Sequence, residues 1–333
     1  MTEVEGVDWQ STEDEVHHAV TADGWHLALY RYRPAAGSPA RPPVLMGHGL
    51  CGSHWIFDLA PDVSLARFLA DRGFDTWLVD LRGRGESWPP GGPDPALQWT
   101  FDDFVFSDLP AAVAYVRDQT GTVDLWWLGT EMSGLLLYAA VLAGTAGGVR
   151  GGVTCGSPAV TPRDAEVPGV TTPYPEPADG RYPFSMVRAI GPQLAREQSP
   201  ALESSFRPAN TDWEVTARYF VNGVPDEATA LVDQFRDWMA NAVMRSRAGD
   251  AWSERLGDFT RPVLVMVGAA DRQRPAPAVR GTYEALGSMD KTFVCAGVAD
   301  GFPVDFGHDD LIAGRDAPTT VFPVIAGWLE ERS

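Results

Sequence analysis

The chain has 333 residues, 44% of them hydrophobic, which suffices for one large α/β domain with an inserted subdomain. Its formal net charge of −19 disfavours nucleic acids and anionic membranes as partners. Three cysteines, Cys51, Cys155 and Cys295, are too few for a disulfide framework. Because no apolar run resembles a signal peptide or a membrane span, we expect a cytoplasmic protein.

Strand and helix patterns alternate along most of the chain. Residues 1–14 are acidic and lack periodicity, which predicts a flexible tail. Residues 15–33 contain two strand-like runs around Asp23-Gly24, a hairpin signal. Further strands are expected at 44–48, 74–80, 150–155, 262–268 and 292–296. Helices are expected at 61–72, 101–119, 276–287 and 318–331.

This alternation predicts a mostly parallel sheet that is covered by helices on both faces. Residues 158–258 interrupt it, because they begin Pro-rich and then become helical around 188–196, 212–220 and 228–242. We therefore expect a core made of residues 15–157 and 259–333, and a cap or lid made of residues 158–258.

Two patterns in the sequence resemble ligand sites but lack the spacing that such sites need. The glycines of Leu81–Ser87 lack the GxGxxG spacing and no helix follows them, which argues against a nucleotide site. His17, His18 and His26 have no cysteine or carboxylate at ligand spacing. We therefore expect neither a metal nor a cofactor.

The most informative stretch is Leu125–Leu136, where an apolar strand-like run turns tightly into an apolar helix-like run. This is the layout of a nucleophile elbow, whose flanking residues must be small because strand and helix backbones approach closely. Gly129 and Ser133 are the small flanks, and Glu131 stands at the apex, where an esterase has serine. Two alternatives are an exposed first-turn glutamate and Ser133 as nucleophile in a shifted register, within the helix.

Three further segments end strands in the predicted sheet and carry reactive groups. They are the Gly49–Gly52 turn, Asp271 and His308. Functional groups collect at the carboxyl ends of parallel strands, and nucleophile, acid and histidine in this order form the α/β-hydrolase triad. Taken alone, Asp271 is as readily a turn former and His308 a structural histidine.

The chain resembles the α/β-hydrolase superfamily, and within it the acid lipase branch. Phe101–Gly121 is similar to the helix before the elbow in those lipases, and Gly307–Pro318 to their histidine segment. His48–Leu50 matches the superfamily's His-Gly turn. The resemblance covers nearly all of the chain except the tail and the 158–258 insert. It implies an α/β-hydrolase fold, with a mostly parallel eight-stranded sheet, helices on both faces and an inserted helical cap.

The resemblance also implies roles for single residues. Leu50 and Met132 are implied as oxyanion-hole N–H donors, and Asp271 and His308 as the acid and the histidine of the triad. Glu131 departs from the family's serine. Haloalkane dehalogenases and epoxide hydrolases of this superfamily carry aspartate at that position and form an ester intermediate.

Glutamate is one methylene longer than aspartate, which brings hydrogen bonding to His308 within reach. Two carboxylates, Glu131 and Asp271, favour the imidazolium and should raise the pKa of His308. We therefore interpret Glu131 as proton acceptor or charge stabiliser and His308 as acid and orienter. The N–H groups of Leu50 and Met132 would then stabilise an enolate or phenolate.

Aromatic side chains gather in the insert and after the His-Gly turn. At least half of the insert's aromatics should form its own core, and the rest should line an apolar cavity for a large, flat or polycyclic substrate. The expected substrate-binding residues are His48, Cys51, His54, Trp55, Tyr182, Phe184, Trp213 and Trp238.

Three functions follow from these observations. The leading one is a cofactor-independent, non-hydrolytic enzyme that uses Glu131/His308 acid–base chemistry on a hydrophobic metabolite, in C–C bond formation, cyclisation, isomerisation or elimination within natural-product biosynthesis. The second is a hydrolase of an epoxide, halide or ester with Glu131 as covalent nucleophile. The third is a non-catalytic small-molecule binding protein. The sequence leaves homo-oligomerisation open.

Overall fold

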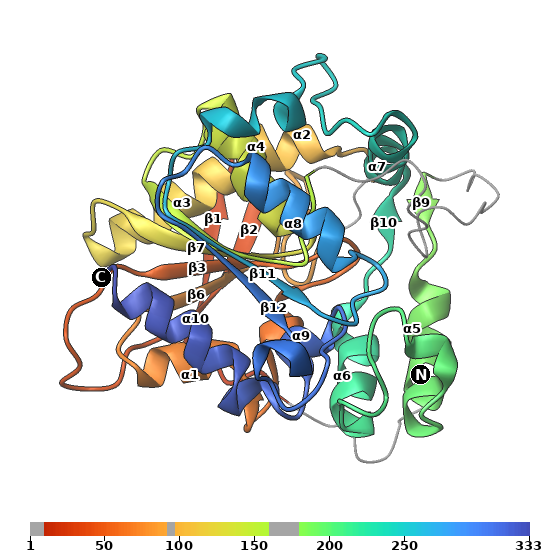
Figure 1. The fold of residues 1–333 in the computed structure, drawn as a ribbon. Coiled ribbons are helices and arrows are strands. Elements are labelled where there is room, and N and C mark those ends of the chain that lie inside the picture. Colours follow the sequence, from red (N-terminus) through yellow and green to blue (C-terminus); the bar gives the residue numbers. More distant parts are fainter. Residues whose placement is uncertain (1–9, 92–96, 160–179) are drawn as a thin grey trace.

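The structure is a computed structural model that describes residues 10–91, 97–159 and 180–333. One sheet contains β1 (Glu15–Val20), β2 (His26–Tyr32), β3 (Val44–Gly47), β6 (Thr76–Val79), β7 (Leu125–Thr130), β8 (Val149–Cys155), β11 (Val263–Gly268) and β12 (Lys291–Ala296). Its strand order is β1-β2-β6-β3-β7-β8-β11-β12 (Figure 1). Strand β2 runs antiparallel to both of its neighbours, and the strands from β6 to β12 are parallel. The predicted mostly parallel, eight-stranded sheet is confirmed.

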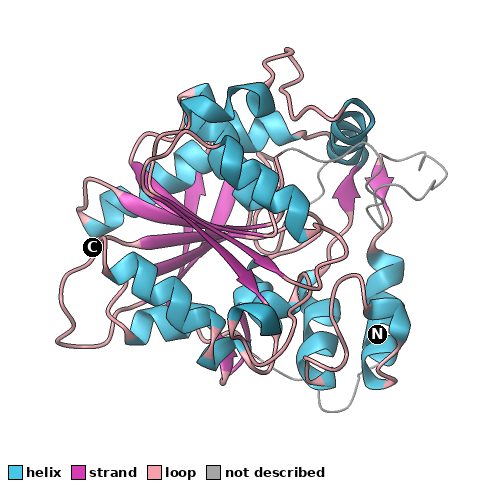
Figure 2. Ribbon diagram, in the orientation of Figure 1, coloured by secondary structure: helices cyan, strands magenta, loops and turns pink. Residues whose placement is uncertain are grey.

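Helices cover both faces of this sheet (Figure 2). One face carries α3 (Leu109–Thr120), α4 (Met132–Ala143) and α8 (Ala276–Ala285), and the other carries α1 (Leu65–Asp71) and α10 (Val321–Glu330). Successive strand residues point to opposite faces, so Trp127 of β7 packs in the first layer and Leu128 in the second. Apolar residues on both sides therefore bury the central strands, whereas the edge strands β1 and β12 remain partly exposed.

The remaining elements are short segments or belong to the insert. They are η1 (His54–Phe57), β4 (Asp58–Ala60), β5 (Val63–Ser64), α2 (Phe101–Asp103), η2 (Phe104–Asp108), β9 (Arg181–Tyr182), α5 (Ser185–Arg196), η3 (Pro200–Leu202), α6 (Trp213–Gly223), β10 (Glu227–Ala228), α7 (Thr229–Asn241), η4 (Trp252–Asp258), η5 (Val298–Asp300), α9 (Asp310–Ala313) and η6 (Ala317–Thr319). The helix expected at 61–72 begins only at Leu65, because Ser64 caps it by accepting a hydrogen bond from the Arg67 N–H.

The insert is helical where the sequence predicts helices. Strands β9 and β10 add a short antiparallel pair that the sequence analysis does not predict. A fully buried ion pair joins it to the core, between Arg84 and Glu227. The indole N–H of Trp99 donates to the same Glu227 carboxylate at 3.2 Å. These contacts fix the insert over the carboxyl ends of the strands. The limits of the core and the insert remain predictions.

The N-terminal segment departs from expectation at its inner end. Residues 1–9 of the predicted tail lie outside the described residues. The Thr12 N–H donates to the Asp58 carboxylate at 2.6 Å, and the Asp14 N–H donates to the Arg31 carbonyl at 2.8 Å. The predicted flexible tail therefore does not extend to residue 14.

The elbow between β7 and α4 is a tight turn. Glu131 adopts φ 47° and ψ −106°, a conformation that L-residues rarely adopt. The Ser133 hydroxyl donates to the His48 carbonyl at 2.6 Å, and the Trp127 indole donates to the Ser133 carbonyl at 2.8 Å. A Cβ atom at Gly129 would lie 2.2 Å from the Ser133 carbonyl carbon. The turn therefore depends on glycine at this position.

We predict that Gly129→Ala lowers the free energy of unfolding by about 3 kcal/mol, because backbone must move to admit the methyl group. The matched control is Gly147→Ala, where a Cβ atom meets nothing within 4 Å, and we expect a change within about 0.5 kcal/mol. Urea unfolding measures both. Equal stability of the two variants would contradict the close approach at the elbow.

Candidate active site

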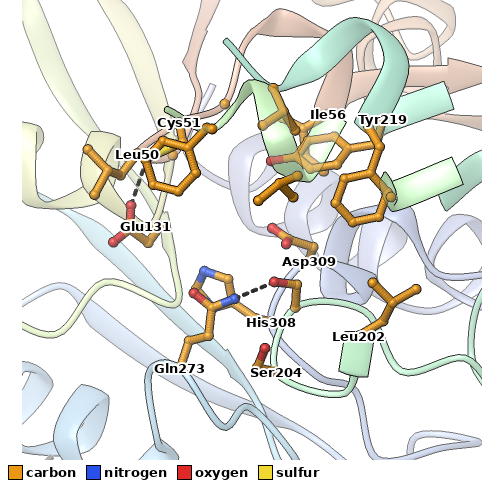
Figure 3. A pocket seen from close by; sticks show the side chains of 18 of the residues that line it. Leu50, Cys51, Ile56, Glu131, Leu202, Ser204, Tyr219, Gln273, His308 and Asp309 are labelled. Atoms are coloured by element: carbon orange, nitrogen blue, oxygen red, sulfur yellow. Dashed lines mark hydrogen bonds between the residues drawn. The ribbon is translucent and has the colours of Figure 1, made fainter. Parts of the chain in front are cut away.

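Glu131 occupies the elbow apex, and its side chain is buried. Its Oε2 atom accepts the Leu50 N–H at 2.8 Å and the Met132 N–H at 2.7 Å. Leu50 follows β3 and Met132 begins α4, so the two amides converge from neighbouring strand ends. The donors implied for an oxyanion hole therefore meet on the chain's own carboxylate (Figure 3 shows the Leu50 contact).

The other oxygen of Glu131 has a partner that sequence reasoning missed. The buried guanidinium of Arg274 forms an ion pair with Glu131 Oε1. Asp271 Oδ1 accepts the Gln273 N–H at 2.9 Å and the Arg274 N–H at 2.7 Å, which fixes the turn that presents Arg274. Burial raises the pKa of Glu131, but the charges of Arg274 and His308 outweigh it and hold that pKa below its usual range.

His308 and Asp271 form the second half of the site. The His308 Nδ1 atom lies 2.7 Å from Asp271 Oδ2. Burial lowers the pKa of His308, yet the charge and hydrogen bond of Asp271, with Asp309 and Glu131, raise it to about 9. The predicted direction is confirmed. The described side chains of Glu131 and His308, which the sequence brings within possible reach of each other, form no hydrogen bond, because Leu50, Met132 and Arg274 hold the carboxylate.

Asp309 adds a carboxyl group that the sequence analysis passed over. It directly follows His308 and borders the same cavity. Burial raises the pKa of Asp309 to about 7, although the charge of His308 opposes that rise. In the sequence, the only sign of this group was an acidic residue directly after His308, the histidine that the resemblance implies.

Glu131, Arg274, His308 and Asp309 border a cavity of about 330 Å³ between core and insert (Figure 3). Most of its surface is apolar. The core supplies Gly49, Leu50, Cys51, Gly52, Ile56, Thr130, Glu131, Gln273, Arg274, His308 and Asp309. The segment after β8 supplies Phe184, Val187, Ile190, Gly191, Leu194, Ala201, Leu202, Ser204, Ser205, Tyr219, Phe220 and Val224.

The sequence profile of the alpha/beta hydrolase fold family matches residues 42–312. The chain belongs to this family. Human lipase member K is 33% identical over 138 residues, which are 38% of this chain and 34% of that protein. Bovine gastric triacylglycerol lipase is 35% identical over 127 residues, 34% of this chain and 31% of that protein. The matches thus span about a third of these relatives' lengths, and the resemblance to the lipase branch is confirmed.

Solved structures agree on the fold of this alpha/beta hydrolase. A soluble variant of monoglyceride lipase from Saccharomyces cerevisiae has a TM-score of 0.63 at 16% identity and covers 98% of this chain and 97% of its own. A thermophilic esterase from Thermogutta terrifontis has a TM-score of 0.60 at 19% identity, with 95% of this chain and 98% of its own covered. At such identities the likeness concerns architecture alone.

The two histidines predicted for substrate binding do not border the cavity. His48 is fully buried, and its Nδ1 atom lies 2.9 Å from the Gly49 carbonyl. Burial, with the charge of Arg84, lowers the pKa of His48 to about 4. His54 donates from Nδ1 to Asp80 at 2.8 Å. Both histidines therefore stabilise the turn after β3 without bordering the cavity.

Among the other predicted wall residues, Cys51 and Phe184 border the cavity, whereas four aromatics pack elsewhere. Trp55 and Trp213, the first residue of α6, are partly buried against the second apolar layer, and Tyr182 is buried against Phe184. The Trp238 indole donates to the Arg245 carbonyl at 2.8 Å, and its ring packs on that of Phe101. The insert uses these rings for its own packing and for its attachment to the core.

Within residues 10–91, 97–159 and 180–333, no three histidine, cysteine or acidic side chains gather in a way that would hold a metal ion. No helix in that part of the chain is long and apolar enough to cross a membrane.

We predict that Arg274→Met lowers the free energy of unfolding by about 3–5 kcal/mol, because it leaves the Glu131 charge buried without its partner. Replacing both residues, as Glu131→Leu with Arg274→Met, should recover most of the loss. Urea unfolding of the set measures the coupling.

The matched control is Arg245→Met, which removes a half-exposed partner of Asp237 and should cost far less. An Arg274→Met variant as stable as the Arg245→Met variant would contradict the buried pair.

Proposed function

We propose that this alpha/beta hydrolase hydrolyses an uncharged, hydrophobic small molecule through a covalent ester on Glu131. The observation that carries the proposal is the orientation of the carboxylate in a residue that borders the cavity, with Oε2 on two backbone N–H groups and Oε1 not bonded to either of them. In an ester formed through Oε1, Oε2 would be the carbonyl oxygen, already seated where a tetrahedral oxyanion needs its donors.

The contact with Arg274 is compatible with attack by Oε1. A carboxylate offers about four lone-pair sites on its two oxygens. Leu50 and Met132 use the two on Oε2, and Arg274 uses one on Oε1. One lone pair on Oε1 remains for a carbon atom of the substrate. Arg274 thereby keeps Glu131 ionised and fixes its direction.

His308 would act in the second step. While Glu131 is ionised, its charge helps to keep the pKa of His308 at about 9. An ester carries no charge, so its formation removes that contribution and lets the imidazole release its proton more easily. The neutral imidazole, oriented by Asp271, can then take a proton from a water molecule that attacks the ester.

The charges at the site favour an uncharged substrate. Glu131 and Asp271 are balanced by Arg274 and the protonated His308. An additional anionic group would have to be desolvated in an apolar cavity where, among the described residues, the cations Arg274 and His308 are already paired. The lipase and esterase names of relatives and structural neighbours agree with hydrolysis.

Non-hydrolytic acid–base chemistry is the second candidate, and the protonated state of His308 favours it. In this case His308 donates a proton to the bound metabolite, and Glu131 acts only through its charge. Leu50 and Met132 would serve a substrate enolate only after Glu131 leaves their N–H groups. Cofactor-independent steps of natural-product biosynthesis fall in this class.

Turnover in water enriched in ¹⁸O separates these candidates, with styrene oxide and 1-bromohexane as probes, because each would alkylate the carboxylate to an ester. If Glu131 forms an ester, water attacks its carbonyl carbon, so heavy oxygen must appear in the Glu131 peptide by mass spectrometry. Glu131→Gln should abolish turnover. Conversion of a probe to a product of isomerisation or elimination, without heavy oxygen in that peptide, would favour the second candidate. Full activity of Glu131→Gln would contradict both candidates, and binding without turnover would favour a binding protein.

A further inference from the structure

Two carboxyl side chains enter the same apolar cavity from different segments. Glu131 comes from the elbow, and Asp309 comes from the segment after β12. In the view of Figure 3 they lie on either side of the His308 ring. The proposed function uses Glu131 and His308 but gives Asp309 no task.

The surroundings of the two carboxyl groups are opposite. Glu131 accepts hydrogen bonds from Leu50, Met132 and Arg274, which stabilise its ionised form. The Asp309 carboxyl has no hydrogen-bond donor among the described residues, and its backbone N–H is used by the Ser205 carbonyl at 2.8 Å. Burial without donors stabilises the protonated form and raises the pKa of Asp309 to about 7.

Carboxyl groups whose surroundings separate them in this way divide the work of an acid and a nucleophile. We propose that Asp309 is the catalytic proton donor of this site, and that the substrate is a strained cyclic ether, such as an epoxide, whose ring oxygen receives the proton. This inference rests on the proposed ester of Glu131 and narrows its substrate class.

Two other groups at the cavity hold their protons more tightly than Asp309 does. Burial raises the pKa of Tyr219 far above its usual range, and the pKa of His308 is raised to about 9. Asp309 is therefore the strongest acid of the three. A halide would leave as an anion that needs no proton, so a carboxyl donor serves an oxygen leaving group specifically.

The net reaction adds one water molecule to an epoxide and gives a diol. Glu131 Oε1 bonds to one ring carbon, the bond from that carbon to the ring oxygen breaks, and the oxygen takes the Asp309 proton. His308 then gives its own proton to Asp309 and becomes neutral. The neutral imidazole takes a proton from water, whose oxygen attacks the Glu131 ester carbonyl. The substrate alkoxide leaves with the proton held by His308. The Glu131 carboxylic acid finally gives its proton to His308, which restores the starting state.

A matched pair of alkylating probes tests the assignment: styrene oxide, whose oxygen needs a proton, and 2-phenylethyl bromide, whose bromide does not. The rate of mass gain on the Glu131 peptide is measured after rapid quenching. Asp309→Asn should slow alkylation by the epoxide about 100-fold or more and leave alkylation by the bromide within about twofold. Asp300→Asn, which removes an exposed carboxylate of the same segment, should change neither rate.

The pH dependence supplies a readout that a structural role would not move. Wild-type alkylation by the epoxide should fall as pH rises through about 7, the pKa of Asp309, and alkylation by the bromide should not. The groups that interact electrostatically with Asp309 are His308, Asp271, Asp310, Glu131 and Tyr219. Asp309→Asn should be at least as heat-stable as wild type at pH 8, since a raised carboxyl pKa makes the ionised form destabilising there.

The outcomes are distinct. If neither probe alkylates Glu131, the proposed function itself fails. If both do and Asp309→Asn reacts with the epoxide as fast as wild type, the ester survives and Asp309 is not the donor. If Tyr219→Phe stops the epoxide reaction while Asp309→Asn does not, the donor is Tyr219 and the assignment is overturned.

Discussion

The site depends on one interaction, the pair of hydrogen bonds that the backbone amides of Leu50 and Met132 donate to the Glu131 carboxylate. Those amides are positioned by the parallel pairing of β3 with β7 and by the first turn of α4. The Met132 N–H, at the N-terminus of α4, favours negative charge, and the Leu50 N–H in the turn after β3 adds a second donor. The fold provides an anion site at this point, and a glutamate at the elbow fills it from within the chain.

A buried glutamate at the elbow requires a compensating positive charge nearby. A buried carboxylate is costly unless it is paired and hydrogen-bonded. Arg274 supplies the pair, and the same turn that presents it donates two N–H groups to Asp271. Asp271 is thereby left with its other oxygen for His308. These four side chains are therefore electrostatically linked: Arg274 and His308 lower the pKa of Glu131, and Asp271 and Glu131 raise the pKa of His308.

The sequence predicted the strands of the eight-stranded sheet, their mostly parallel arrangement and the positions of Glu131, Asp271 and His308 at strand ends, because local patterns of apolar residues and glycine mark those ends. It did not reveal Arg274, whose direction is set by a turn around Asp271. It also assigned Trp238 and Trp213 to a substrate cavity, although they pack within the protein. Whether an aromatic ring faces a cavity depends on how helices of the insert dock, and composition does not report that. Asp309 was overlooked because its place at the cavity and its lack of hydrogen-bond donors among the described residues appear only in the tertiary structure.

A crystal structure of the free protein at atomic resolution tests the central claim most directly, because it shows both the seat of the Glu131 carboxylate and, through its two carbon–oxygen bond lengths, its ionisation. We predict Oε2 on the Leu50 and Met132 amides, Arg274 on Oε1, and nearly equal bond lengths. A Glu131 side chain turned away from the amides, with water in its place, or one with a clearly longer protonated bond, would contradict the account.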